Sequence, residues 1–316
     1  MDVLITGITG GLGRALAARL AGARITGTCR RAEVTLEGAR VVAAELGSVD
    51  WAPLVQGQDV VFHLAAYVHR KPAGLDEEAA VFELNAGSTA RLAQACRQSG
   101  AILVFASTVA VLEGAEPRGR RAGTAYGQSK LAAEAAIRRE GEAGLRFAIV
   151  RFPLLYGPYG RGNMEKMLQA IASRRYWPIG PSGCPKSCLA FDDAARALIA
   201  CATDPAALGQ TYVAAPPVAP TLGEIHRAAY AALGRRLPPA VPGALAVALA
   251  LAAEAVLALL GHRARLREQV ETLIAPAAYD GGELASAVGF RPEVSLHEGL
   301  RGLADWLRSR REAGKR

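Results

Sequence analysis

Residues 124–131 read TAYGQSKL and place a tyrosine and a lysine four positions apart, at Tyr126 and Lys130. In a helix, positions i and i+4 share one face, so the two side chains would project side by side. A phenol beside an ammonium ionises more readily, because the positive charge favours the phenolate. The pair could therefore transfer protons, although a surface tyrosine and lysine at the start of a helix would show the same spacing.

A glycine-rich turn near the start of the sequence, TGITGGLG, follows the apolar residues 2–6. The spacing G-x-x-G-x-x-G suits a tight turn, close approach of a pyrophosphate and close packing of helix on strand. The helix that follows would present unpaired N–H groups to the phosphates. Because the turn joins a strand to a helix, it predicts dinucleotide binding by Gly7, Thr9, Gly10, Gly11, Leu12 and Gly13.

The second strand ends in GTCRRAE, where an acidic residue would hold the ribose hydroxyls of NAD. Arg30 and Arg31 stand there instead, and guanidinium groups suit a 2′-phosphate. Two solvated arginines after a strand are also common. We expect NADP as the preferred cofactor, bound in part by Arg30, and NAD as the alternative.

Apolar runs alternate with alanine-rich segments of helical spacing up to about residue 151. Near-continuous apolar strands between helices are typical of a parallel sheet covered on both faces. Beyond that point proline and glycine become frequent and the alternation stops. We predict an α/β fold: a doubly wound parallel Rossmann sheet over residues 1–151, then a smaller, irregular C-terminal substrate domain over residues 152–316. Part of 185–215 is expected to pack back on the sheet.

MDVLITG resembles a buried strand and not a secretory signal, and an odd number of cysteines fits a reduced cytoplasmic protein. The chain has five cysteines, and Cys184 and Cys188 lack the companions of a metal site, so we expect no metal. The net charge of +8 comes from scattered arginines, which gives no expectation of nucleic-acid binding.

Together these motifs resemble the extended short-chain dehydrogenase/reductase family, which includes NAD-dependent epimerases and dehydratases. The matching pieces are TGITGGLG, VVFHLAA, FASTVAV, YGQSK and RFPLLYGP. The resemblance implies that Tyr126 is the catalytic acid/base and Lys130 its partner. It also implies that Thr108 hydrogen-bonds the substrate oxygen and that Asn85 shapes the proton-relay helix.

The same resemblance places residues 63–66 beside the nicotinamide ribose, with Leu64, Ala65 and Ala66 as cofactor contacts, and Pro153 over the nicotinamide face. A free tyrosine titrates near pH 10, too high for an efficient base. We expect Lys130 and the oxidised nicotinamide to lower the pKa of Tyr126. The phenolate could then take the proton of a substrate hydroxyl while the cofactor carries the hydride.

Residues 238–261 form an apolar stretch with flanking arginines. Our first expectation is a helix that caps an apolar substrate pocket. Shallow contact with a membrane surface through 240–261 is second, and a transmembrane helix is third. With the C-terminal LASAVGFRPEVSLHEGLRGLADW, the stretch resembles the 3β-hydroxysteroid and sterol-4-carboxylate dehydrogenase branch, which implies a sterol, terpenoid or lipid-like substrate.

The main expectation is therefore an NAD(P)-dependent dehydrogenase or reductase that interconverts a secondary alcohol and a ketone on a hydrophobic substrate. Two other functions remain open. A nucleotide-sugar epimerase or dehydratase would use the same tyrosine and lysine with tightly bound NAD, and a non-catalytic cofactor-binding regulator is a further alternative. A homodimer is implied by analogy with the family.

Several charged residues carry weaker hypotheses. Asp192 and Asp193 are expected at a helix N-cap, and 118–121 in a solvated, arginine-rich loop that could instead clamp an anion. Four histidines lack metal spacing and are expected at the surface or at helix ends: His69, His226, His262 and His297.

Overall fold

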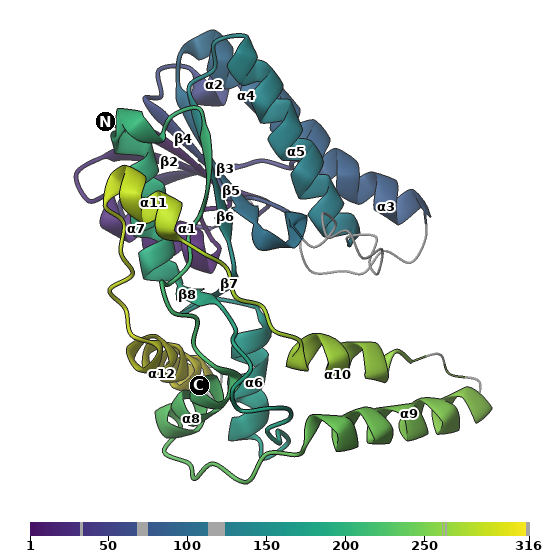
Figure 1. Ribbon diagram of the computed structural model, residues 1–316. Helices are drawn as coiled ribbons and strands as arrows, with labels where there is room; N and C mark the ends of the chain where they lie inside the picture. The colour runs from purple at the N-terminus through teal and green to yellow at the C-terminus, as the bar shows by residue number, and fades with distance from the viewer. Residues whose placement is uncertain (32–33, 68–74, 113–123, 261, 263, 314–316) are drawn as a thin grey trace.

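Among the residues that the structure describes, seven parallel strands form one sheet in the upper part of the molecule (Figure 1). The computed structural model describes residues 1–31, 34–67, 75–112, 124–260, 262 and 264–313. The strand order is β3-β2-β1-β4-β5-β6-β9. The bounds are β1 Asp2–Thr6, β2 Arg24–Cys29, β3 Ala39–Ala43, β4 Val60–His63, β5 Ile102–Thr108, β6 Phe147–Phe152 and β9 Gln210–Val213. This is the order of a Rossmann fold, which confirms the predicted α/β class.

Helices cover both faces of the sheet, as its near-continuous apolar strands require. One face packs against α1 (Gly11–Arg19), α7 (Phe191–Thr203) and α11 (Gly282–Val288). The other packs against α2 (Ala52–Val55), α4 (Ser88–Ser99) and α5 (Ala125–Glu142). Two apolar cores result, one on each side of the strands. A further helix, α3 (Leu75–Phe82), leads into a π-helix over Glu83–Gly87.

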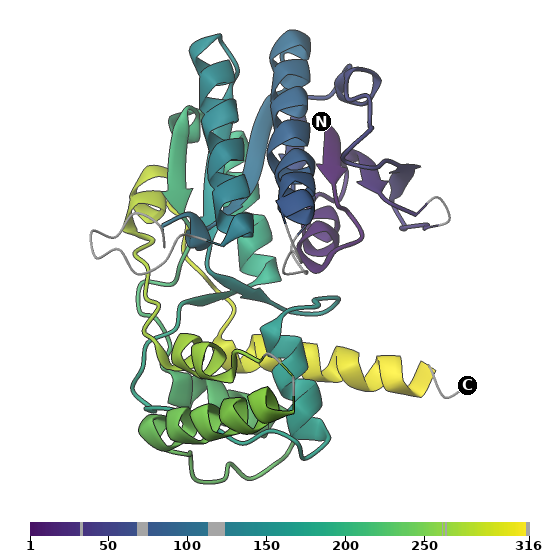
Figure 2. The same ribbon diagram turned by 90° about the vertical axis from the view of Figure 1, so that its right-hand side faces the viewer.

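The lower part of the molecule has its own apolar core (Figures 1 and 2). It is built from the strand pair β7 (Leu154–Tyr156) and β8 (Cys188–Ala190) with α6 (Asn163–Ala172), α8 (Leu222–Ala232) and α12 (Leu296–Ala313). From this core α9 (Gly243–Leu259) and α10 (Leu266–Ile274) project to one side. The division of the chain near residue 151 stays a prediction. Two elements that follow this residue, α7 and β9, belong to the layers of the upper sheet.

The strand order reverses direction between β1 and β4, which lie side by side. In open parallel sheets, ligands bind beyond the carboxyl ends of the strands at such a switch point. The glycine turn follows β1, and residues 64–66 follow β4, so both lie at this point. No helix within the described residues is long and apolar enough to cross a membrane.

Replacing Gly13 by alanine should destabilise the protein by about 1–3 kcal/mol, because overpacked sites cost about this much. The new Cβ would lie 2.6 Å from the carbonyl oxygen of Gly7 and 2.7 Å from the Cα of Ile8, both backbone atoms. Urea unfolding measures the change. Gly302→Ala on α12 is the control, because its Cβ meets nothing within 4 Å, and it should equal or exceed wild-type stability. A Gly13→Ala protein as stable as wild type would contradict the close packing.

Candidate active site

The glycine turn has the backbone that a dinucleotide pyrophosphate requires. Gly7 adopts φ +71°, and an added Cβ would lie 3.1 Å from the backbone of Ala65, so the turn and the segment after β4 touch. Gly10 is exposed and precedes α1, where it offers no side chain to cap the first-turn amides. Those amides therefore remain free for an anion. The free N–H groups at the start of α1 fit the pyrophosphate of the dinucleotide that the sequence predicts.

A threonine at the end of β1 ties the glycine turn to the segment after β4. The Thr6 hydroxyl oxygen accepts hydrogen bonds from the backbone N–H groups of Leu64 and Ala65, each at 3.1 Å. Its remaining proton is then donated to Nδ1 of His63, 2.7 Å away. Thr6 is fully buried, so the positions of these two backbone segments are set from inside the protein.

The His63 imidazole continues this chain of hydrogen bonds toward α5. Burial, with the positive charge of Lys130, lowers the pKa of His63 to about 3, so the ring is neutral. Since Nδ1 accepts from Thr6, Nε2 carries the proton and donates to the Thr89 hydroxyl at 2.9 Å. Thr89 in turn donates to the carbonyl oxygen of Asn85 at 2.6 Å.

Asn85 lies in the π-helix and connects it to α5. Its amide accepts from the backbone N–H of Tyr67 at 2.7 Å and donates to the Ser129 hydroxyl at 3.0 Å. Ser129 donates to the backbone carbonyl of Tyr126 at 2.8 Å. Single π-turns inside α-helices often occur at functional sites, because they re-aim backbone groups. A continuous buried chain thus runs from the end of β1 to the backbone of Tyr126.

Tyr126 and Lys130 lie one turn apart on α5, as their spacing predicts. Lys130 is buried, and its ammonium donates to the carbonyl oxygen of Ala106 at 2.6 Å and lies 3.8 Å from the centre of the Phe105 ring. Burial lowers the pKa of Lys130 to about 7, although the charge of Glu134 opposes this. The lysine is therefore positioned by the end of β5 and not by the phenol.

The expected lowering of the Tyr126 pKa is not found in the chain by itself. Tyr126 is half-buried, and burial raises the pKa of its phenol to about 12. Burial is the cause of this shift, and the Lys130 ammonium is directed at the carbonyl oxygen of Ala106 on β5. For Tyr126, the loss of solvation therefore outweighs the effect of a cation on the same helix.

Of the two hydroxyls that end β5, Thr108 has exposed surface and Ser107 does not. Thr108 begins the 3₁₀-helix Val109–Val111 and accepts from the N–H of Ala110 at 3.2 Å. Ser107 instead donates to the buried Glu134 at 2.6 Å. Thr108 is therefore the less buried of the two hydroxyls, and its role toward a substrate stays a prediction.

Sequence reasoning did not identify the Glu134 cluster beneath the site. Arg151 donates two hydrogen bonds to this carboxylate, at 2.9 and 2.6 Å, and Arg138 donates a third at 2.9 Å. Burial would raise the pKa of Glu134, but the bonds from Arg151 and Ser107 and the charge of Arg151 bring it below its usual value. The cluster fixes α5 to β5 and β6. One signal was present: Glu134 follows Lys130 by one helical turn.

The remaining predicted site residues follow the carboxyl ends of β2, β4 and β6. Leu64, Ala65 and Ala66 follow β4, and Pro153 is buried between β6 and β7. Arg30 is exposed just after β2. Their roles toward a cofactor stay predictions.

Several other sequence hypotheses are settled by contacts. Asp192 and Asp193 lie in the first turn of α7 and not at its N-cap, which is Ala190. Asp193 accepts from the backbone N–H groups of Glu293 and Val294, both at 2.9 Å, and is therefore structural.

His226 is buried and bonded to the Tyr176 hydroxyl, whereas the sequence suggested an exposed position. His69 and the arginine-rich loop with Arg118, Arg120 and Arg121 lie outside the described residues. Within the described part of the chain, no cluster of residues could hold a metal ion.

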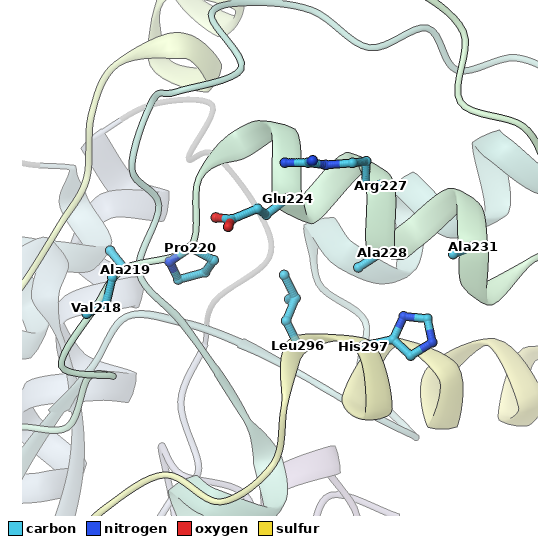
Figure 3. A pocket seen from close by; sticks show the side chains of 9 residues that line it. All are labelled: Val218, Ala219, Pro220, Glu224, Arg227, Ala228, Ala231, Leu296 and His297. Carbon is cyan, nitrogen blue, oxygen red and sulfur yellow. The ribbon is translucent and has the colours of Figure 1, made fainter.

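A hollow of about 500 Å³ lies away from this site, between α8 and the start of α12 (Figure 3). Glu224 and Arg227 of α8 line one side, and Leu296 and His297 line the other. None of the predicted catalytic or cofactor-binding residues lines it, so it gives no support for a second catalytic centre.

Sequence comparison connects this site to a known family. The sequence model described as RmlD substrate binding domain matches residues 1–204. This chain belongs to the RmlD substrate binding domain family. The match spans the glycine turn, the π-helix, Tyr126 and Lys130. No curated protein sequence matches the chain.

Solved structures share the fold of this RmlD-family chain over nearly its whole length. MoeE5 in complex with UDP-glucuronic acid and NAD is 23% identical, with a TM-score of 0.77, 98% of this chain covered and 100% of that chain. The UDP-glucuronic acid 4-epimerase from Bacillus cereus is 16% identical, with a TM-score of 0.75 and coverages of 98% and 99%. The UDP-N-acetylglucosamine 4-epimerase from Methanobrevibacter ruminantium M1 is 18% identical, with a TM-score of 0.76 and coverages of 98% and 98%.

These findings confirm the fold and the broad family, and they do not support the steroid-dehydrogenase branch. Two of these neighbours are named as 4-epimerases of UDP-sugars, and none of the three as a sterol enzyme. At identities below 25%, the likeness to solved structures shows the fold alone.

Replacing Lys130 by methionine should change stability in a pH-dependent way. The pKa of Lys130 is lowered to about 7 in the folded protein from 10.5. Below pH 7 both states are protonated and the folded protein bears the full cost of a buried charge. Between pH 7 and pH 10.5, Lys130 binds a proton in the unfolded chain but not in the folded protein, so the stability of the wild type rises with pH. We expect the stability gained by Lys130→Met to be largest near pH 6 and to shrink toward pH 10.

Urea unfolding at several pH values measures this difference. Ionisations that the two proteins share cancel in the difference between their free energies of unfolding, so wild type is the matched control. A difference that stays constant from pH 6 to pH 10 would contradict a lysine that is neutralised by burial.

Proposed function

We propose that this chain is an NAD(P)-dependent epimerase that inverts a secondary alcohol on a nucleotide sugar. The observation that carries the proposal is the pairing of Tyr126 with buried Lys130, beside Thr108, at the open edge of a sheet whose first turn suits a dinucleotide. The choice of substrate class is supported by the similar proteins solved with UDP-sugars and NAD.

The arrangement of α9 also favours this substrate class over a sterol. A hydrophobic substrate was expected because residues 238–261 would cap its pocket. In both ribbon views α10 lies between α9 and the sheet, and large apolar side chains of α9 are exposed (Figures 1 and 2). The apolar helix therefore does not supply that cap.

Tyr126 would exchange the proton of the reacting hydroxyl. When bound, the nicotinamide would supply reversible hydride transfer at the carbon that bears this hydroxyl. The phenol is poised as a proton donor, because burial raises its pKa to about 12. It becomes a base only when additional positive charge lies close to it, so proton removal would begin only in the loaded site.

Lys130 and Thr108 would assist in different ways. With a pKa of about 7, Lys130 can hold or release a proton close to neutral pH. Thr108 has a hydroxyl at the substrate side of β5 and would orient the reacting oxygen. An epimerase returns the hydride and the proton to the opposite face, so the reaction needs no net oxidant.

Replacing Tyr126 by phenylalanine should lower epimerisation by about 10²–10⁴-fold, since the acid/base group is lost. UDP-glucose, UDP-glucuronic acid and UDP-N-acetylglucosamine are the substrates to test, with the 4-epimer detected by proton NMR. Dinucleotide binding, measured by thermal shift, should be unchanged. Tyr212→Phe is the control, because it removes a hydroxyl on β9 that donates to the carbonyl oxygen of Ala206 in the 3₁₀-helix Pro205–Ala207, apart from the site.

The wild-type protein distinguishes the two candidate reactions. Net reduction of added NAD or NADP by a steroid alcohol, with no epimer formed from any nucleotide sugar, would contradict the proposal.

Arg30 and Arg31 support a preference for NADP, because no acidic side chain ends β2 and both arginines are exposed there. Charge-assisted hydrogen bonds contribute about 1.5–3 kcal/mol, so Arg30→Ala with Arg31→Ala should weaken NADP about tenfold or more. NAD lacks the 2′-phosphate, and its affinity should change little. Calorimetric titration of both cofactors checks this, and an equal loss for both would refute the assignment.

A further inference from the structure

The outer face of α9 is an apolar surface that the fold leaves uncovered. Leu245, Leu249, Val256 and Leu259 are between 51% and 88% exposed. With Ala252 their spacing places them on one stripe of the helix, about 20 Å long. This outer stripe is apolar from Leu245 to Leu259, although α9 does not meet the criteria for a membrane span.

The opposite face of α9 explains why the stripe points outward. Ala246 and Ala250 are buried on the side that packs against α10. Glu254, the acidic residue of α9, accepts from the backbone N–H of Arg267 at 2.9 Å and so is turned toward α10 as well. The outer stripe therefore carries no charge of its own. Because α10 lies between α9 and the upper sheet (Figures 1 and 2), a stripe opposite α10 also faces away from that sheet.

A basic hollow adjoins the start of this helix. It has a volume of about 370 Å³ and is lined by Arg174, Arg235 and Arg236. Arg235 is held by the carbonyl oxygens of Ile171 and Ala172, at 2.7 and 2.8 Å. Arg174 and Arg236 are exposed, and neither forms an ion pair with an acidic side chain of the described residues.

An exposed tryptophan joins the basic hollow to α9. Trp177 is 55% exposed, lines the hollow, and donates from its indole nitrogen to the carbonyl oxygen of Pro239 at 2.8 Å. Ile179 pairs with Val241 in the same connection. Tryptophan prefers the boundary between headgroups and acyl chains, because its ring is apolar and its N–H is polar.

We propose that the outer stripe of α9 and the adjoining arginines dock this protein on the surface of an anionic lipid bilayer. The apolar stripe inserts among acyl chains, and Arg174 and Arg236 meet lipid phosphates. A second copy of the chain fits less well, because pairing two such stripes would leave both arginine clusters without an acidic partner. This proposal stands independently of the epimerase activity.

Vesicle co-sedimentation of the full chain tests the docking. Wild type should bind vesicles of phosphatidylcholine with phosphatidylglycerol at least about tenfold more tightly than phosphatidylcholine alone, and added salt should weaken binding. Leu249→Glu with Val256→Glu should abolish binding. Arg174→Glu with Arg236→Glu should weaken it about tenfold or more on the anionic vesicles.

Val218→Glu is the matched control, since it also adds a carboxylate at an exposed valine, 81% accessible, and should bind as wild type does. The variants alter exposed side chains, so their unfolding curves should match wild type. The proposal is overturned if wild type fails to bind anionic vesicles, or if the stripe variant still binds them. It is also overturned if sedimentation velocity shows a dimer that this variant dissociates while vesicles remain unbound.

Discussion

The site depends on a lysine ammonium buried at the end of a strand. Lys130 is held by the carbonyl oxygen of Ala106 and the face of the Phe105 ring, both on β5. A charge in such surroundings is costly, and its pKa falls to about 7 as a result. The surrounding structure must therefore keep β5 and α5 in register, since a small displacement would leave the ammonium without a partner.

Two polar networks supply that register from opposite sides. Glu134, bonded by Arg151, Arg138 and Ser107, joins α5 to β5 and β6. The chain of hydrogen bonds through His63 and Asn85 joins the end of β1 to the backbone of α5. Buried polar groups of this kind stabilise only when every member is satisfied, which makes them specific for one arrangement. The two networks thus position the glycine turn and the helix that carries Tyr126 and Lys130.

Local patterns in the sequence were sufficient to predict the parts of the site that are close in the chain. The glycine turn needs only a positive φ at Gly7 and close packing at Gly13, and the Tyr126–Lys130 pair needs only helical spacing. The networks could not be predicted in this way, because their members lie far apart in sequence. The π-helix at Asn85 depends on those same contacts. The sterol hypothesis is not supported. It depended on residues 238–261, whose composition shows that they are apolar but not which side they face.

The most direct test follows an isotope through the reaction. UDP-glucose deuterated at carbon 4 is incubated with the protein, and the product is analysed by NMR and mass spectrometry. If Tyr126 exchanges only the hydroxyl proton while a held dinucleotide takes and returns the hydrogen on carbon, the inverted product keeps its deuterium at carbon 4. Inverted product with solvent hydrogen at that carbon would contradict the account.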